Sequence, residues 1–446
     1  MGMPWPRKHY TRLLVLVIIF AGFFLRIYNL EKLAGLDYDQ DISAWWIKQF
    51  LIDKKFSLIG QEISLGRIFI VPFYYYLLAP FYLIFKLDPI AANIFVSLVS
   101  LVSMYLIYRV GTILFNQSTG LIALLIYAFS SQINFYDRTT APSSLIILLS
   151  LSSLYFLLTK RDLWLGPVLG MTFSVSPAAI LLIFQTFFFR FKKKIVSLVI
   201  IFFMASPLLF FDLRHDFMIT KRIFQALFSG QRETDGYPLL QKLFNNLQTI
   251  AGSFRQQIFR LQIDDYMTNV YLNFSTALFW ILIFLKGGYT FLQKKIFFIW
   301  FLTPVVFFSL YPYHVPEYYF LSLFPVTIIF FAAFMVKRLP HKFLFLFLFL
   351  FIVINSWLVL GTKNNLSMFY KKQAVRYIIT QTQGQPFRVD YDIVVGQNNG
   401  FKYLFYWLNH EPSSTAKIRY IITVPENKNK MPGQVFGKIK VSTINE

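Results

Sequence analysis

Three aspartates stand at alternate positions in the stretch GLDYDQDISAWW, residues 35–46, directly after an apolar run. A carboxylate can act as a general base when its pKa is raised. The pKa of an acid rises when the acid is held near hydrocarbon, because burial disfavours its charged form. Asp41 precedes a run with the apolar spacing of an interfacial helix, so we expect it to be the N-cap of that helix. Asp37 and Asp39 have no such role and are the candidate bases, although ordinary solvated loop acids would look the same.

Cationic and imidazole side chains follow later apolar runs, where they could hold an anion such as a phosphate. The candidates, with their polar neighbours, are Asp137 and Arg138, Arg214 and His215, and His314, Glu317 and Tyr318. Each has a structural alternative. Asp137 and Arg138 could pair at a helix end, and the alternating charges of DLRHDF could neutralise one another. His314 and Glu317 could belong to a loop kinked at Pro316, and Tyr318 could be an interfacial belt residue.

The composition indicates that these residues belong to a membrane protein. Of the 446 residues 56% are hydrophobic and 14% are charged, with a mean hydropathy of +0.54, whereas soluble domains carry about 25% charged residues. Apolar runs near the ~20 residues that span hydrocarbon recur along most of the chain. The sequence therefore predicts a mainly α-helical, polytopic bundle in the cell (plasma or inner) membrane.

The remaining bulk features exclude several classes of function. The net charge of +22 is dispersed in short clusters rather than along one face, so no nucleic-acid partner is expected. The chain has no cysteine, which excludes disulfides, thiolate metal sites and cysteine nucleophiles. The histidines form no HExxH-type pair, so no histidine-built metal site is expected.

About ten to twelve hydrophobic segments can be read, at 13–28, 68–86, 90–108, 119–136, 142–159, 164–189, 195–211, 269–286, 295–311, 317–336 and 342–360. Basic clusters mark cytoplasmic loops and place the N-terminus in the cytoplasm. They lie before residue 13 and at 190–194, 286–295 and 337–342. Counting crossings between them places the loops 31–67 and 212–268 and the tail 361–446 on the extracytoplasmic side.

The middle of the chain does not fit simple alternation of spans, which would place residues 136–144 in the cytoplasm. Pro72 and Pro80 interrupt one segment, and several Gly and Pro residues interrupt 164–189. Helices broken in this way are tolerated when they are buried in protein. We therefore expect one non-spanning segment in 68–108 and a bent hairpin at 164–189, which place 136–144 outside.

Two extracytoplasmic regions have a pattern of their own. The tail contains the strand-like runs RVDYDIVV and RYIITV and the helix-like run KKQAVRYIIT, which predict a small α/β domain over 361–446 beside a membrane module over 1–360. The loop 212–268 contains the amphipathic pieces ITKRIFQALF and LLQKLFNNLQTI. We expect these pieces to form helices over the site, because long loops in compact proteins usually serve function.

The run from LRIYNLEKL to ISAWW, followed by PFYYYLLAPFYLIF, resembles the start of the dolichyl-phosphate-mannose–protein mannosyltransferase and lipid A aminoarabinose transferase-like enzymes. NFYDRTTAPSSL, SPLLFFDLRHDF and PYHVPEYYFLSLFP match further in order, so the resemblance covers about residues 1–360. It implies the GT-C fold and an inverting transfer of a sugar from a polyprenyl-phosphate donor to a lipid, glycan or protein acceptor. Asp39 matches the first acid of the family's Asp-Glu motif, which acts as the base.

Gln40 stands where that motif has its second acid, which lowers the expectation of a bound divalent metal, and Asp37 or Asp41 could compensate. For the leaving phosphate we expect positive charge from the Arg and His candidates. Two other classes of function stay open at this point. One is a transporter or flippase for a lipid-linked glycan, which would carry charges within its spans. The other is a non-catalytic membrane scaffold whose tail binds partners.

Overall fold

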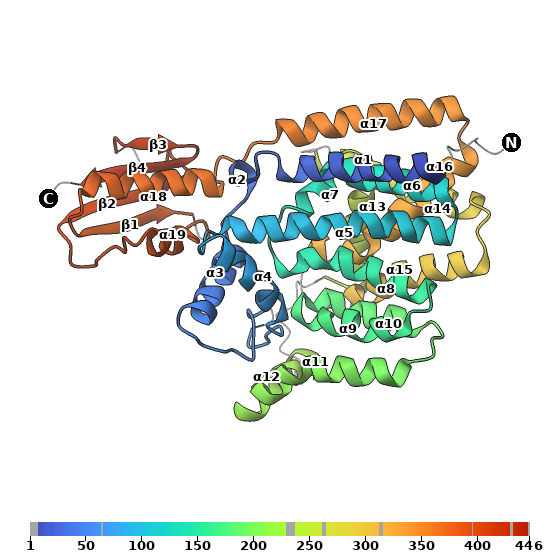
Figure 1. Ribbon diagram of the computed structural model, residues 1–446, viewed down its shortest axis with the longest axis horizontal. Coiled ribbons are helices and arrows are strands. Elements are labelled where there is room, and N and C mark those ends of the chain that lie inside the picture. The colour runs from blue at the N-terminus through green and yellow to red at the C-terminus, as the bar shows by residue number, and fades with distance from the viewer. Residues whose placement is uncertain are drawn as a thin grey trace.

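The computed structural model describes residues 8–63, 66–228, 237–260, 265–311, 315–394, 396–428 and 431–444. A bundle of roughly parallel helices carries a small α/β domain at one end (Figure 1). Seven helices of the described part are long and apolar enough to cross a membrane. They are α1 (Lys8–Ile27), α5 (Ile90–Leu114), α11 (Lys194–Arg214), α14 (Tyr266–Lys286), α15 (Phe291–Leu310), α16 (Phe324–Arg338, entered through the 3-10 turn Glu317–Leu323) and α17 (His341–Gly361).

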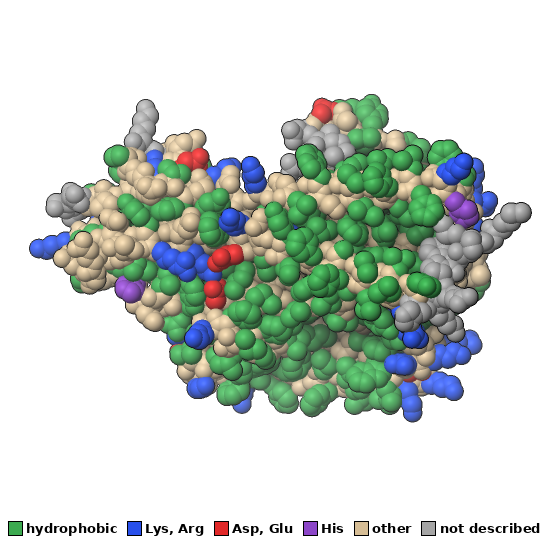
Figure 2. Space-filling view, turned by 45° about the horizontal axis from the view of Figure 1, so that its top comes forward, with side chains coloured by type: hydrophobic (Ala, Val, Ile, Leu, Met, Phe, Trp, Pro, Cys, Tyr) green, Lys and Arg blue, Asp and Glu red, His purple; other side chains and the backbone are tan. Residues whose placement is uncertain are grey.

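Shorter helices lie among these spans or in the segments that connect them (Figure 1). They are α2 (Leu30–Leu33), α3 (Tyr38–Leu51), α4 (Phe73–Ile84), α6 (Gln117–Phe129), α7 (Ser131–Tyr136), α8 (Ile146–Leu158), α9 (Leu165–Gly170), α10 (Leu181–Phe187), α12 (Met218–Phe228) and α13 (Leu239–Ile258). Hydrophobic side chains cover much of the bundle face seen in Figure 2, as expected of a surface that faces lipid. The structure thus confirms the predicted helical membrane fold.

Hydrogen bonds between loops identify the end of the bundle that is remote from the α/β domain. Gln293 Nε2 donates to the carbonyl of Leu114 at 2.6 Å, and Lys337 Nζ donates to that of Gly287 at 2.9 Å. Lys295 Nζ donates to the carbonyl of Phe188 at 3.0 Å. The basic clusters at 190–194, 286–295 and 337–342 therefore gather at one end, and Figure 2 shows Lys and Arg side chains at this end as well as near the α/β domain.

The middle of the chain has the predicted irregular arrangement. Helix α4 has 12 residues, about 18 Å, which is too short to cross hydrocarbon. The segment 162–192 is a hairpin: the backbone N–H of Lys192 donates to Asp162 Oδ2 at 2.6 Å, so both of its ends meet. Its tip reaches the opposite end, where Val71 N–H donates to the carbonyl of Phe173 at 2.9 Å. Residues 136–144 consequently lie at the same end as the 35–46 stretch.

The α/β domain contains α18 (Met368–Thr382), β1 (Phe387–Ile393), α19 (Phe401–Trp407), β2 (Ile418–Val424), β3 (Gln434–Phe436) and β4 (Ile439–Ile444). The sheet has the order β1-β2-β4-β3, with β1 parallel to β2 and the other pairs antiparallel. Strands β1 and β2 and helix α18 lie where the sequence predicted them.

Two buried lysines of α18 attach this domain to the membrane bundle. Lys372 Nζ contacts Glu31 and Asp88, each at 2.7 Å. Lys371 Nζ donates to the carbonyl of Leu36 at 2.8 Å and lies 3.3 Å from Asp37 Oδ1. The α/β domain is therefore joined directly to the segment that begins α3.

Candidate active site

Helix α3 begins one turn earlier than predicted, and this changes the role of two residues. Asp37, not Asp41, is its N-cap, and Gln40 completes the capping box by accepting the backbone N–H of Asp37 at 3.0 Å. Asp41 already lies within the first turn, where burial raises its pKa. The prediction that Asp41 caps the helix is therefore wrong, because Gln40 and Asp37 satisfy the free N–H groups.

Asp39 lies beside polar groups of the loop after α3. Its Oδ1 accepts a hydrogen bond from Gln61 Nε2 at 3.2 Å, and Tyr75 Oη donates to Gln61 Oε1 at 3.0 Å. Burial raises the pKa of Asp39, the bond from Gln61 opposes this shift, and the charge of Asp37 adds to it. Asp39 is thus a carboxylate of increased basicity with one described side-chain donor.

Asp39 lines a cavity of about 380 Å³. The walls come from the loop after α3, from the turn that enters α8, from the tip of the 162–192 hairpin and from the turn after Pro316. Gln61, Ser143, Ser176 and Tyr318 are among the polar residues that line it. The cavity therefore brings together Asp39 and Tyr318, two residues selected from the sequence.

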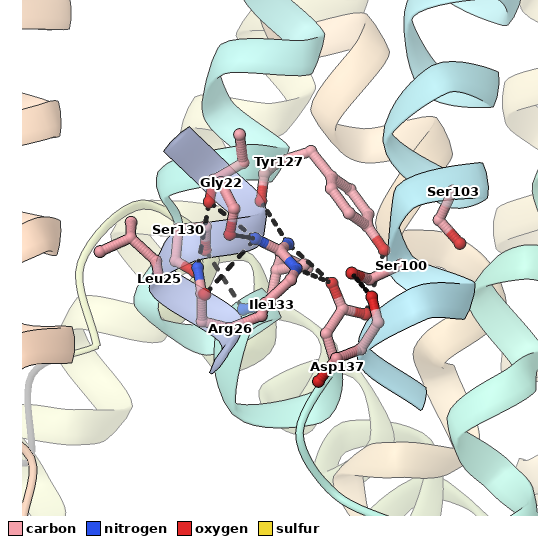
Figure 3. A network of polar contacts seen from close by, with 12 residues as sticks. Gly22, Leu25, Arg26, Ser100, Ser103, Tyr127, Ser130, Ile133 and Asp137 are labelled. Atoms are coloured by element: carbon pink, nitrogen blue, oxygen red, sulfur yellow. Dashed lines mark hydrogen bonds and ion pairs between the residues drawn. The ribbon is translucent and has the colours of Figure 1, made fainter. Parts of the chain in front are cut away.

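Asp137 has a different environment and is not available to a substrate. It is 4% exposed and contacts Arg26, which is fully buried, through Arg26 Nε at 2.8 Å. Tyr127 Oη donates to its other carboxylate oxygen at 3.2 Å. Figure 3 shows Arg26 reaching from α1 across to Asp137, with further bonds to backbone carbonyls. The structure does not support the expectation that Asp137 contacts the donor, because Arg26 and Tyr127 occupy its carboxylate inside the bundle.

The Arg138 side chain also has structural partners. Its guanidinium donates to the carbonyls of Leu25 and Arg26 at the end of α1. A cation is favourable at this position because the carbonyls at a helix C-terminus carry partial negative charge. The predicted role in binding a phosphate is therefore not supported, and the predicted pairing with Asp137 is replaced by these bonds.

The two candidate residues of the DLRHDF motif, Arg214 and His215, have different surroundings. Arg214 is exposed at the end of α11 and lines none of the described cavities. His215 stacks on Phe211 with ring centroids 3.9 Å apart and lines a second cavity of about 530 Å³. The charged residues that line it are the cations Arg67, Lys221 and Arg222 and the acids Asp216 and Glu62, and Glu62 also lines the Asp39 cavity. A region rich in cationic side chains therefore adjoins the candidate base.

The residues around Pro316 are only partly described. His314 lies outside the described residues. Glu317 accepts a hydrogen bond from Gln132 Nε2 at 2.7 Å and lines a third cavity, whereas Tyr318 lines the Asp39 cavity. The turn at Glu317 thus separates two cavities.

Sequence reasoning missed Gln61, Arg67, Lys221 and Arg222. Gln61 and Arg67 lie in a loop without a recognisable motif, and only the fold brings Gln61 to Asp39 and Arg67 into the second cavity. Lys221 and Arg222 follow DLRHDF within one amphipathic piece, so a helix turning back at residue 217 would have placed them beside His215.

Among the described ranges no group of three or more His, Asp or Glu side chains is arranged to hold a metal ion.

The sequence was compared with protein families and with curated proteins. Residues 71–211 match the family model described as dolichyl-phosphate-mannose-protein mannosyltransferase. None of the curated proteins compared with the chain matches it in sequence.

Two solved structures resemble the whole chain in fold. ArnT from Cupriavidus metallidurans, bound to undecaprenyl phosphate, superposes with a TM-score of 0.61 and 11% identity over 98% of both chains. The oligosaccharyltransferase AglB from Archaeoglobus fulgidus, in complex with an inhibitory peptide and a dolichol-phosphate, gives 0.53 and 14% identity over 95% of this chain and 70% of that one. The chain therefore has the GT-C fold of membrane glycosyltransferases, as the resemblance of its first loop indicates.

Proposed function

We propose that this protein transfers a sugar from a polyprenyl-phosphate carrier to a hydroxyl group of an extracytoplasmic acceptor, with Asp39 as the general base. The observation that carries this proposal is the position of Asp39, a carboxylate with a raised pKa in a cavity at the end of the bundle that carries the α/β domain. Two proteins of the same fold were solved with undecaprenyl phosphate and with a dolichol-phosphate, which favours a lipid-linked donor.

The proposed reaction is a single displacement. Asp39 accepts the proton of the acceptor hydroxyl, and the oxygen attacks the anomeric carbon of the donor sugar. The bond from that carbon to the phosphate oxygen breaks, and the polyprenyl phosphate leaves with the electron pair. Attack opposite the leaving group inverts the anomeric carbon.

The leaving phosphate needs positive charge, and the second cavity supplies it. Arg67, Lys221 and Arg222 line this cavity, and Glu62 connects it to the Asp39 cavity. Helix α12, which carries Lys221 and Arg222, has an amphipathic sequence suited to the membrane surface, where a lipid phosphate lies. We therefore assign phosphate binding to these residues and to His215 instead of to Arg138 and Arg214.

The proposed reaction requires no metal ion. Gln40 occupies the position of the family's second acid, and its amide oxygen accepts the N–H of Asp37. Gln61 donates an N–H group to the carboxylate of Asp39, which is a bond that a cation at the same oxygen would replace. The cationic second cavity then stabilises the leaving phosphate.

The orientation follows from the distribution of basic residues. The clusters near Lys192, Lys295 and Lys337 lie at the end remote from the α/β domain, and such clusters remain in the cytoplasm. The proposal therefore places the N-terminus in the cytoplasm, and the Asp39 cavity and the domain 361–446 outside.

One experiment tests the reaction. Purified protein is incubated with a set of radiolabelled polyprenyl-phosphate sugars and a membrane extract that supplies acceptors. Labelled product from at least one donor is expected, together with release of polyprenyl phosphate. The absence of transfer from every donor would contradict the proposal.

A labelling experiment tests the orientation. Because the chain has no cysteine, a Glu411→Cys variant and a Lys193→Cys variant each carry a single thiol at an exposed position. An impermeant maleimide should label Glu411→Cys in intact cells and Lys193→Cys only after permeabilisation. The reverse pattern would contradict the proposed orientation.

A further inference from the structure

A third cavity, of about 480 Å³, lies between α13, α14 and the turn at Glu317. The proposed reaction does not use it. Its polar lining consists mainly of amide and hydroxyl groups, among them those of Asn245, Gln248, Thr249, Ser253, Asn269 and Asn273. Aromatic rings of Tyr237, Tyr266 and Phe308 complete the walls. A polar cavity of this size beside a membrane-spanning helix requires a physical reason, because polar groups are costly to bury there.

Several of these polar groups are buried and unpaired. Among the described residues, Gln248 Oε1, Asn273 Oδ1 and both Nε and Nη1 of Arg255 have no hydrogen-bond partner. Arg255 is held in place by its remaining nitrogen, Nη2, which donates to Asn269 Oδ1 at 2.8 Å. These four atoms are buried in the wall of the cavity, so contacts with a ligand fall to the other amide and hydroxyl groups of its lining.

The amide and hydroxyl lining discriminates between ligands. A phosphate monoanion or dianion offers mainly acceptors, so it would leave the amide oxygens of the lining without donors. A hydrocarbon chain would form no hydrogen bond with the lining. A hydroxyl group both donates and accepts, so a ligand with several hydroxyl groups would pair with the amide and hydroxyl groups together. The aromatic rings provide apolar surface for the C–H faces of such a ligand.

We propose that this cavity binds a saccharide and is the acceptor subsite of the enzyme. Glu317 lines this cavity, and the next two residues, Tyr318 and Tyr319, line the Asp39 cavity. A saccharide held between α13 and α14 therefore lies across one turn of chain from the base. The saccharide site stands on its own observations, whereas its role as the acceptor subsite rests on the proposed function.

Binding is measured on the full chain in lipid nanodiscs, with hexasaccharides of glucose, mannose, galactose and N-acetylglucosamine as separate probes. At least one should bind saturably. Gln248→Leu and Asn273→Leu should each weaken that binding several-fold, and the double variant about tenfold or more, because each removes a hydrogen bond. Gln241→Leu is the matched control, since Gln241 lies exposed on α13 and does not line the cavity. Thermal unfolding of each variant shows whether it is folded.

Three results would overturn the saccharide site. They are binding of no hexasaccharide, equal binding by wild type and both leucine variants, and competition by undecaprenyl phosphate, which would identify the cavity as a carrier site.

The acceptor role has a separate readout. Asp39→Asn should bind the saccharide as wild type does, and Gln248→Leu should raise the KM for a saccharide acceptor while leaving kcat unchanged. If no donor supports transfer but binding remains specific to this cavity, the proposed function fails and the saccharide site stands. If transfer proceeds with an unchanged acceptor KM in Gln248→Leu, the acceptor role fails alone.

Discussion

The Arg26–Asp137 network and the Asp39 cavity lie at the same end of the bundle, and their carboxylates differ in burial: Asp137 is buried and Asp39 is half-buried. Asp137 is enclosed by a guanidinium and a phenol inside the protein, whereas Asp39 has a neutral amide donor and faces a cavity. Burial raises the pKa of both carboxylates, but at Asp137 the charge of Arg26 opposes the rise, and Arg26 and Tyr127 occupy both oxygens. Asp39 faces open space that can admit a substrate, so local partners separate a structural acid from a chemical one.

The largest expected effect is on stability, at Asp137. The Asp137→Asn change leaves the Arg26 charge buried without its counter-ion, which typically costs about 3–5 kcal/mol. Unfolding of the detergent-solubilised protein should show this loss, and the double change Arg26→Met with Asp137→Leu should recover part of it. A stable Asp137→Asn variant without transfer activity would break the comparison, because Asp137 would then have a chemical role.

Arg67 tests the assignment of phosphate binding. Removing one group that stabilises a developing anion typically lowers the rate about 10²–10³-fold, so Arg67→Gln should lower kcat/KM on this scale with an unchanged unfolding midpoint. Arg214→Gln is the matched control, because Arg214 is exposed and lines none of the described cavities. An equal loss in both variants would contradict the assignment.

The pH dependence of transfer and of unfolding tests the raised pKa of Asp39. Burial raises the pKa of Asp39, so the base is protonated and transfer declines as the pH falls through a value above the ordinary ~3.9. A raised pKa also means that the charged form of Asp39 destabilises the fold at neutral pH. Asp39→Asn should therefore raise the unfolding midpoint at pH 7 and leave it unchanged at acidic pH, below the ordinary value. A lower midpoint at pH 7 would show that Asp39 stabilises the fold, as Asp137 does.

The smallest effect is expected at Gln40. Glu and Gln serve equally at the third position of a capping box, so Gln40→Glu should keep both the fold and the rate of transfer. A chelator such as EDTA should leave the activity of both proteins unchanged. Inhibition of the wild type by EDTA, reversed by a divalent cation, would contradict the metal-free reaction.

The fold was largely predictable from the sequence because hydrophobic length and basic clusters are strong local signals. They indicated the helical bundle, the hairpin near Pro177 and the strands at Phe387 and Ile418, all of which the structure contains. The start of α3 was misplaced by one turn because Asp37, Asp39 and Asp41 are equivalent N-cap candidates in a sequence. The capping box with Gln40 decides between them.

The site was less predictable because its partners are distant in sequence. Arg26 lies 111 residues from Asp137, and sequence proximity instead suggested Arg138. Gln61 contacts Asp39, and Arg67 lines a cavity with His215, only because a loop without a motif folds between them. Tyr318 could be selected because a proline turn at a span end is a local signal.

The central claim is that Asp39 removes the acceptor proton, and the transfer rate of Asp39→Asn tests it most directly. General-base catalysis contributes about 10²–10⁴-fold, so this variant should lose transfer on that scale while it still binds the polyprenyl-phosphate sugar and unfolds at or above the wild-type temperature. Transfer at the wild-type rate by a folded Asp39→Asn protein would contradict the account.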